Sequence, residues 1–168
     1  IDNCAKILKA NNKDNLTDRC NSVMKELKDQ EQTIERLNSR IAAIQAQTLF
    51  DVSKIINGVR IIVANLLEEG NVTSEQLKTI CDKVKEKAPK SAAVIIGKSG
   101  NKIMLAVAVG KEAQSLGLHA GKLAKEVALL TGGNGGGKPD MSMAGVKDES
   151  KIEFALSKAQ DIILDMIK

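Results

Sequence analysis

The sequence predicts an α/β fold of the α+β kind, with a mixed β-sheet flanked by helices and preceded by a long coiled-coil-like helical hairpin. Three observations predict it: a heptad repeat of apolar residues in the first third of the chain, short β-branched runs that alternate with amphipathic helical patterns after it, and Gly or Pro residues between them. We therefore expect a helical linker at 1–57 and an α/β domain at 58–168, a length typical of one domain.

The first segment carries a heptad seam, in which apolar or small residues alternate in steps of four and three. They are Leu16, Cys20, Val23, Leu27, Gln30, Ile34, Leu37, Ile41, Ile44 and Thr48. Neither Pro nor Gly interrupts residues 1–57, and charges of both signs flank the seam, as on a solvated coiled coil. At 1.5 Å per residue the helix is roughly 50 Å long, so part of its seam needs a partner.

Two partners for the seam are open. An upstream apolar face that includes Cys4 and Ile7, followed by a polar turn at 11–15, predicts an antiparallel hairpin within one chain. A second chain is the other partner, and both can hold because a short upstream helix cannot cover the whole seam. The residues expected in a dimer contact are Val23, Leu27, Ile34, Leu37, Ile41 and Ile44.

The second segment opens with a strand and a helix. A β-branched run at 59–67 predicts the strand, which ends in a turn rich in polar residues and glycine. Thr73 begins the helix with a capping box to Gln76, and Pro89 ends it.

A hairpin and two further helices complete the domain. Two apolar runs, 92–96 and 103–109, flank a Gly-Lys-Ser-Gly-Asn segment and predict the β-hairpin. Helices are expected at 120–130 and 149–168, on either side of a glycine-rich loop. This order of elements is typical of a compact domain built on a mixed sheet.

Composition excludes several classes of protein. The net charge is only +4, so attraction to a polyanion has to come from local clustering. Three cysteines without a Cys-x-x-Cys pair, and a single histidine, argue against a disulfide framework or a zinc site and fit a reducing cytosol. No apolar run is long enough to cross a bilayer, and no signal-peptide pattern is present. We expect a cytoplasmic protein without metal or membrane contact and, because it starts at Ile1, a fragment of a longer chain.

The stretch from Thr131 to Asp148, TGGNGGGKPDMSMAGVKD, is the most informative, since five of its first seven residues are glycine. Exposed amides in such a loop can bind an anion, and Lys138 adds a charge suited to phosphate. The loop fits the first seven positions of a Walker motif, but Pro139 replaces the magnesium-binding hydroxyl and no strand precedes it, so we exclude an NTPase. The dinucleotide-binding fingerprint also fails. A flexible linker is the remaining alternative.

Side chains near the loop are further candidates. His119, at the start of the helix before the loop, is either a phosphate contact or general acid, or a capping or packing residue. Lys122 and Lys125 share an exposed side of that helix and form a basic patch with the loop lysine, or are simply solvated. Phe50 and Phe154, the only aromatic residues, fall in apolar patterns typical of a core, which excludes base stacking on a row of aromatics. Any bound RNA is then recognised through its backbone and shape.

With its context, the loop resembles the C-terminal domain of alanyl-tRNA synthetase. The His-Ala-Gly helix start of that family matches 119–121, its G-G-x-G-G-G-[RK]-P-D segment matches 132–140, and Asn57-Gly58-Val59 also resembles it. Residues 1–56 are similar to the family's helical linker. Two positions depart from the pattern: Lys138 stands where arginine is common, and 141–146 replaces a segment with Ala-Gln and more glycine.

The resemblance implies a domain that is not catalytic and needs no cofactor. It implies binding to the outer corner of an alanine-specific tRNA, support of dimerisation, and coupling of aminoacylation with editing in an ATP-dependent ligase. The residues implied in RNA binding are Gly132, Gly133, Asn134, Gly135, Gly136, Gly137, Lys138, His119, Lys122 and Lys125. The alternative is a nucleotide- or cyclic-dinucleotide-binding accessory domain of a DHH-type phosphoesterase, whose metal-binding half this chain, with one histidine, cannot supply.

Overall fold

A computed structural model describes residues 2–10, 15–70 and 72–167 of the 168-residue chain. The chain divides into two compact units, Ile1–Arg40 and Ile41–Lys168. Helix α2 begins in the first unit and ends in the second.

The first unit contains α1 (Asp2–Ile7) and most of α2 (Leu16–Asp51), the long helix that the heptad pattern predicts. Near the start of α2, Arg19 donates a hydrogen bond from Nε to the carbonyl of Leu8 at 2.9 Å. Ile7 is 73% exposed. The polar turn expected at 11–15 lies outside the described residues, apart from Asn15.

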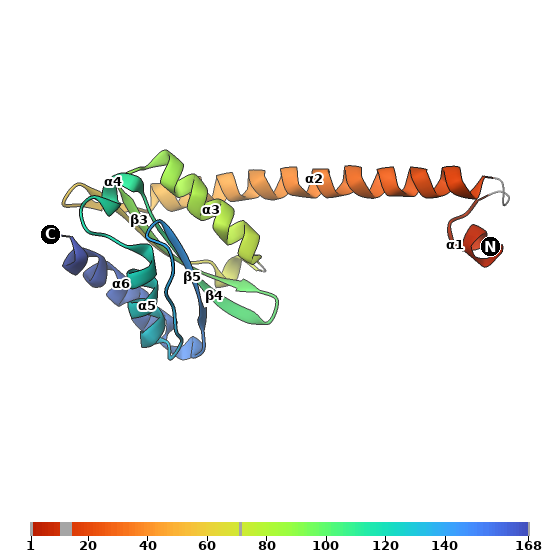
Figure 1. The fold of residues 1–168 in the computed structure, drawn as a ribbon. Coiled ribbons are helices and arrows are strands. Elements are labelled where there is room, and N and C mark those ends of the chain that lie inside the picture. Colours follow the sequence, from red (N-terminus) through yellow and green to blue (C-terminus); the bar gives the residue numbers. More distant parts are fainter. Residues whose placement is uncertain (1, 11–14, 71, 168) are drawn as a thin grey trace. The chain divides into compact units, whose positions relative to one another are not determined.

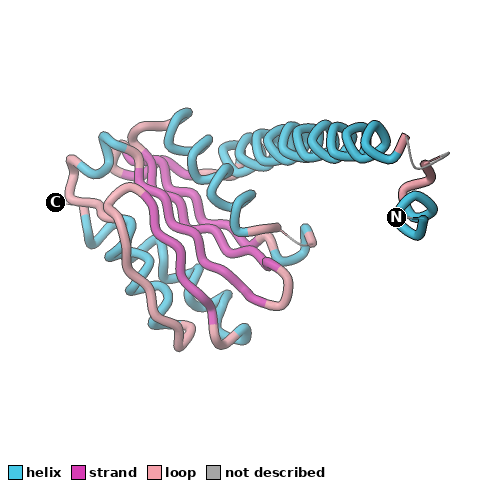
Figure 2. Tube along the Cα trace, turned by 45° about the vertical axis from the view of Figure 1, so that its right-hand side comes forward, coloured by secondary structure: helices cyan, strands magenta, loops and turns pink. Residues whose placement is uncertain are grey.

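The second unit is built on a mixed β-sheet, drawn in magenta in Figure 2. The sheet has five strands in the order β1-β2-β3-β4-β5. Its strands are β1 (Lys54–Ile56), β2 (Val59–Asn65), β3 (Ser91–Ser99), β4 (Lys102–Val109) and β5 (Met141–Val146). Strands β2 and β3 are parallel, and every other neighbouring pair is antiparallel. The structure thus confirms the predicted α+β fold.

Helices cover both faces of this sheet (Figure 1). The helices after α2 are α3 (Ser74–Lys87), α4 (Lys111–Gln114), α5 (Ala120–Leu130) and α6 (Ile152–Met166), with short 3₁₀ turns at Leu67–Glu69 and Glu149–Lys151. Helices α5 and α6 pack on one face, while α3 and the last turns of α2 pack on the other. Because β3 lies between both layers, residues 92–96 are all fully buried, as expected for a central strand with a continuous apolar run.

Two strands were not expected from the sequence. The α2 helix ends at Asp51, and β1 then pairs with β2 through a turn at Asn57 and Gly58, which have φ angles of 52° and 75°. Positive φ at both positions suits a two-residue hairpin turn. Strand β5 lies in the second half of the stretch that the sequence predicts as a glycine loop. It forms there because it pairs with β4, and its small residues Ser142 and Ala144 are buried.

One of the two expected core aromatics is exposed, and the buried face of α2 differs from the heptad seam. Phe50 is buried, as predicted, but Phe154 is 54% exposed because the buried face of α6 runs through Ala155 and Leu156 instead. At the end of α2 the buried face is not the heptad seam; it consists of Ala42, Ala46, Leu49 and Phe50. The capping box of Thr73 and Gln76 in α3 is confirmed.

Candidate nucleic-acid interface

The glycine loop between α5 and β5 runs back along the whole length of α5. At its start, the amide of Gly133 donates to the carbonyl of Ala128 near the end of α5, at 2.9 Å. At its end, the carbonyl of Pro139 accepts a hydrogen bond from the amide of Ala120, the first residue of α5, at 2.8 Å. The loop therefore forms an ordered strip beside the helix, a different arrangement from a flexible linker.

Close backbone approach explains much of the glycine content. A Cβ on Gly121 of α5 would come within 2.3 Å of the carbonyl oxygen of Gly137, and a Cβ on Gly133 within 2.2 Å of that of Gly145 in β5. A Cβ on Gly135 would come within 2.8 Å of a backbone carbonyl of α5. Any side chain at these positions would push the loop away from α5 or β5. The motif residue Gly121 is thus part of the same packing as the loop itself.

The loop exposes part of its backbone. Gly136, Gly137 and Lys138 are exposed, and their amides have no hydrogen-bond acceptor among the residues that the structure describes. The Ser142 hydroxyl donates to the carbonyl of Gly136 at 2.8 Å, which fixes the strip against β5. These exposed amides can donate to an anion such as a phosphate.

Three lysines lie on or beside this strip. Lys122 and Lys125 of α5 are exposed, as is Lys138 of the loop. In α5 they follow directly after Gly121 and Ala124, whose backbone lies against the loop. The remaining predicted loop residues are also placed: Gly132 and Asn134 are exposed, Gly135 is half-buried and Gly133 is buried.

His119 is the N-terminal cap of α5. Its Nδ1 accepts a hydrogen bond from the amide of Lys122 at 3.3 Å. The carbonyls of Pro139 and Lys138 accept from the first two amides of α5, at 2.8 and 3.0 Å. His119 therefore stands in the capping position that the sequence predicts, and its role as a phosphate contact stays a prediction.

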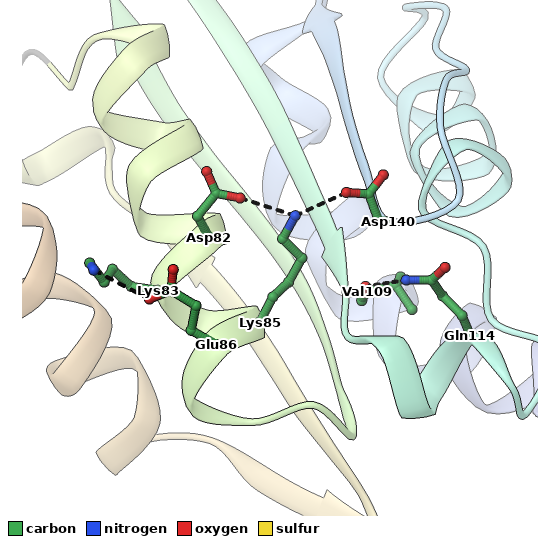
Figure 3. A network of polar contacts seen from close by, with 7 residues as sticks. All are labelled: Asp82, Lys83, Lys85, Glu86, Val109, Gln114 and Asp140. Atoms are coloured by element: carbon green, nitrogen blue, oxygen red, sulfur yellow. Dashed lines mark hydrogen bonds and ion pairs between the residues drawn. The ribbon is translucent and has the colours of Figure 1, made fainter.

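An ion-pair network joins the end of the loop to α3 (Figure 3). The ammonium group of Lys85 lies 3.1 Å from Oδ2 of Asp140 and 3.0 Å from Oδ1 of Asp82. Burial alone would lower the pKa of Lys85, but its hydrogen bonds to both carboxylates outweigh this and raise it. The hydrogen bond from Lys85 lowers the pKa of Asp140. The sequence singled out Asp140 only as part of the motif and missed Lys85, because no local pattern links residues 55 positions apart.

The six residues expected in a dimer contact lie along α2. Leu27, Leu37 and Ile41 are 47–48% exposed, Ile34 and Ile44 are 57% and 68% exposed, and Val23 is half-buried. These are large exposures for aliphatic side chains, which ordinarily bury most of their surface.

The described parts of the chain contain neither a metal-ligand cluster nor a membrane-spanning helix. Within residues 2–10, 15–70 and 72–167, no group of three or more His, Cys, Asp or Glu side chains is placed to hold a metal ion. Over the same residues no helix combines the length and apolar character needed to cross a bilayer. Cys81 is buried, and burial raises the pKa of its thiol to about 12.

The fold and the glycine strip define a small α+β domain of a known class. The DHHA1 domain family matches residues 58–165, and the chain belongs to this family. Beyond that domain, the whole chain is similar to alanine–tRNA ligase. The enzyme of Oceanobacillus iheyensis is 32% identical over 169 residues, which cover 100% of this chain and 19% of the ligase. This confirms the resemblance that the loop motif and the helical linker indicate.

Two solved structures have a similar fold. The C-Ala domain of alanyl-tRNA synthetase from Aquifex aeolicus matches with a TM-score of 0.54 at 22% identity, over 66% of this chain and 96% of that chain. A DHH domain from a member of a family of ribosomal proteins matches with a TM-score of 0.53 at 16% identity, over 77% of this chain and 32% of that chain. The chain spans about a fifth of the length of the curated relatives that it matches.

Proposed function

We propose that this chain is a non-catalytic C-terminal part of a cytoplasmic alanine–tRNA ligase. We propose that it binds the outer corner of alanine-specific tRNA without a cofactor, and that it supports dimerisation and the coupling of aminoacylation with editing. One observation carries the proposal. The glycine strip presents exposed amides and Lys138, and it runs along α5, which carries the exposed Lys122 and Lys125; the whole of this chain matches part of an alanine–tRNA ligase.

The chemistry of the strip suits the backbone of folded RNA. Lysines and amides donate to phosphate oxygens, and they carry no information about base sequence. The small residues of the strip let an RNA backbone approach closely. Such recognition reads shape, as expected for the corner of a tRNA, whose bases are stacked and paired.

The experiment measures the affinity of the chain for alanine tRNA across a salt titration. Lys138→Ala should weaken binding and reduce the slope of log K against log salt by about 1, because one phosphate contact is lost. The matched control is Lys78→Ala, which removes an exposed lysine of α3. Equal behaviour of the two variants would contradict a role for the loop.

Self-association through α2 is the second part of the proposal. A heptad seam with five aliphatic side chains about half-exposed or more is what a coiled-coil partner covers. Ile34→Lys should shift the chain from dimer to monomer in sedimentation analysis without lowering the stability of the monomer. Met24→Lys, also exposed but off the seam, is the control. A dimer that survives Ile34→Lys would contradict this part.

The DHH-type alternative predicts a different ligand. A cyclic dinucleotide or mononucleotide should then bind saturably and compete with tRNA. Saturable binding of these ligands, with tRNA affinity unaffected by Lys138→Ala, would replace the tRNA proposal with the accessory-domain function.

A further inference from the structure

The last residues of the glycine loop are held by three different elements. The carbonyl of Asp140 accepts a hydrogen bond from the amide of Val109 at the end of β4, at 2.9 Å. The carbonyls of Lys138 and Pro139 accept from the first amides of α5. The third tie is the side chain of Lys85, from α3.

The Lys85 tie comes from the opposite side of the sheet. Helix α3 packs on the face away from α5, yet Lys85 lies close enough to the start of β5 to pair with Asp140 (Figure 3). The Lys85 side chain is only 19% exposed, while the carboxylates of Asp82 and Asp140 are 51% and 47% exposed. Asp82, one turn earlier in α3, holds Lys85 in position. The pair therefore joins two layers of the domain at the point where the loop ends.

Lys138 lies two residues before this tie. The exposed amides of Gly136, Gly137 and Lys138 lead directly to Asp140, so the position of Asp140 fixes the end of the strip that faces solvent. A glycine-rich backbone that is not held samples many conformations, and a ligand that needs one of them has to offset that entropy.

We propose that Lys85 and Asp140 are positioning residues for RNA binding by the glycine loop, so that an acidic side chain beside the interface increases affinity for a polyanion. This inference rests on the proposed tRNA-binding function. Neither residue needs to touch RNA, because Lys85 is mostly buried and already neutralises the carboxylate that it holds.

A purely electrostatic effect predicts the opposite change in RNA affinity when Asp140 is neutralised. Removal of an acidic group near a polyanion should strengthen binding, because a repulsive charge is lost. Removal of a lysine that contacts phosphate should lower the salt slope by about 1. Positioning predicts weaker binding in both cases with an unchanged salt slope, since no phosphate contact is lost.

The experiment measures alanine-tRNA affinity for the full chain carrying Asp140→Asn or Lys85→Met. We expect each variant to bind about two- to fivefold more weakly, the range that a partly exposed ion pair provides, with the wild-type salt slope. Lys85→Arg keeps the pair and should bind like the wild type. Glu86→Gln, which removes an acidic group of α3 that pairs with Lys83 and leaves the Lys85–Asp140 pair, is the matched control. Unchanged or tighter binding by Asp140→Asn would overturn the proposal.

A second readout needs no RNA. The amides of Ala120 and Val109 donate to carbonyls of Pro139 and Asp140, so their hydrogen exchange reports opening of the loop end. Asp140→Asn and Lys85→Met should each increase exchange at these amides about two- to fivefold, and Glu86→Gln should not. Unchanged exchange would show that the pair does not hold the loop. If the wild-type chain does not bind tRNA, both the proposed function and the positioning role of Lys85 and Asp140 are wrong. If the wild type binds tRNA and both variants bind equally well, only the positioning role is wrong.

Discussion

Substitution of Gly121 by Ala tests whether the glycine strip is packed against α5. The added Cβ would lie 2.3 Å from the carbonyl oxygen of Gly137 and 2.7 Å from its nitrogen, so the loop would have to move by about 0.7 Å or more to reach a tolerable contact. Overpacking of this kind costs about 1–3 kcal/mol. Alanine gains about 1 kcal/mol over glycine in a helix. Because the opposing atoms are hydrogen-bonded backbone, the upper part of the overpacking range applies, about 2–3 kcal/mol, and we expect a net loss of about 1–2 kcal/mol.

The measurement is urea unfolding of Gly121→Ala and the wild type. With an m-value of about 2 kcal/mol per molar, the midpoint should fall by about 0.5–1 M. Lys125→Ala, on the solvent side of the same helix, should change stability by less than about 0.5 kcal/mol and serves as the control. A variant stabilised by about 1 kcal/mol would refute the packing, because alanine then gains its helix propensity without a clash.

Three further predictions follow from the same contacts. Gly133→Ala places a Cβ 2.2 Å from a carbonyl of β5 and should lower the free energy of unfolding by about 1–3 kcal/mol in urea; an unchanged midpoint would argue against the close approach. The pKa of Asp140 is lowered in the folded state, so this carboxylate stabilises the fold above the ordinary carboxyl range near pH 4, and the stabilisation is lost as pH falls through the lowered value. The stability difference between the wild type and Asp140→Asn should therefore be constant from pH 5 to about pH 8 and vanish in acid. A difference that grows below pH 4 would contradict the pairing. Cys4 is exposed and Cys81 is buried with its pKa raised to about 12, so a thiol reagent at about pH 8 should modify Cys4 rapidly and Cys81 only on unfolding; equally fast labelling would contradict the burial.

Local periodicity predicts much of the fold. The heptad spacing identifies α2 because a helix repeats its face every three to four residues wherever it lies. A β-branched run identifies β2, and two apolar runs identify β3 and β4; residues of all three strands lie in the core. Strand β5 escapes this reasoning because its small residues and Gly145 carry little strand preference, and pairing with β4 supplies the stability instead.

Local sequence patterns also miss the long-range contacts of the candidate site. Glycine density singles out the loop, but only the fold reveals that Gly121 and Gly137 touch. The Lys85–Asp140 pair joins residues that no local pattern connects. Phe154 has the sequence environment of a core residue, but the buried face of α6 runs through Ala155 and Leu156, so Phe154 is exposed. Contacts between distant segments depend on tertiary packing, which propensity and spacing do not encode.

The most direct test of tRNA-corner binding compares full-length alanine tRNA with an acceptor-stem minihelix that lacks the corner. Both affinities are measured for the full chain across a salt titration. We expect the full tRNA to bind about tenfold more tightly or better, with an affinity that falls steeply as salt rises. Equal and weak binding of the two RNAs would contradict recognition of the corner by this domain.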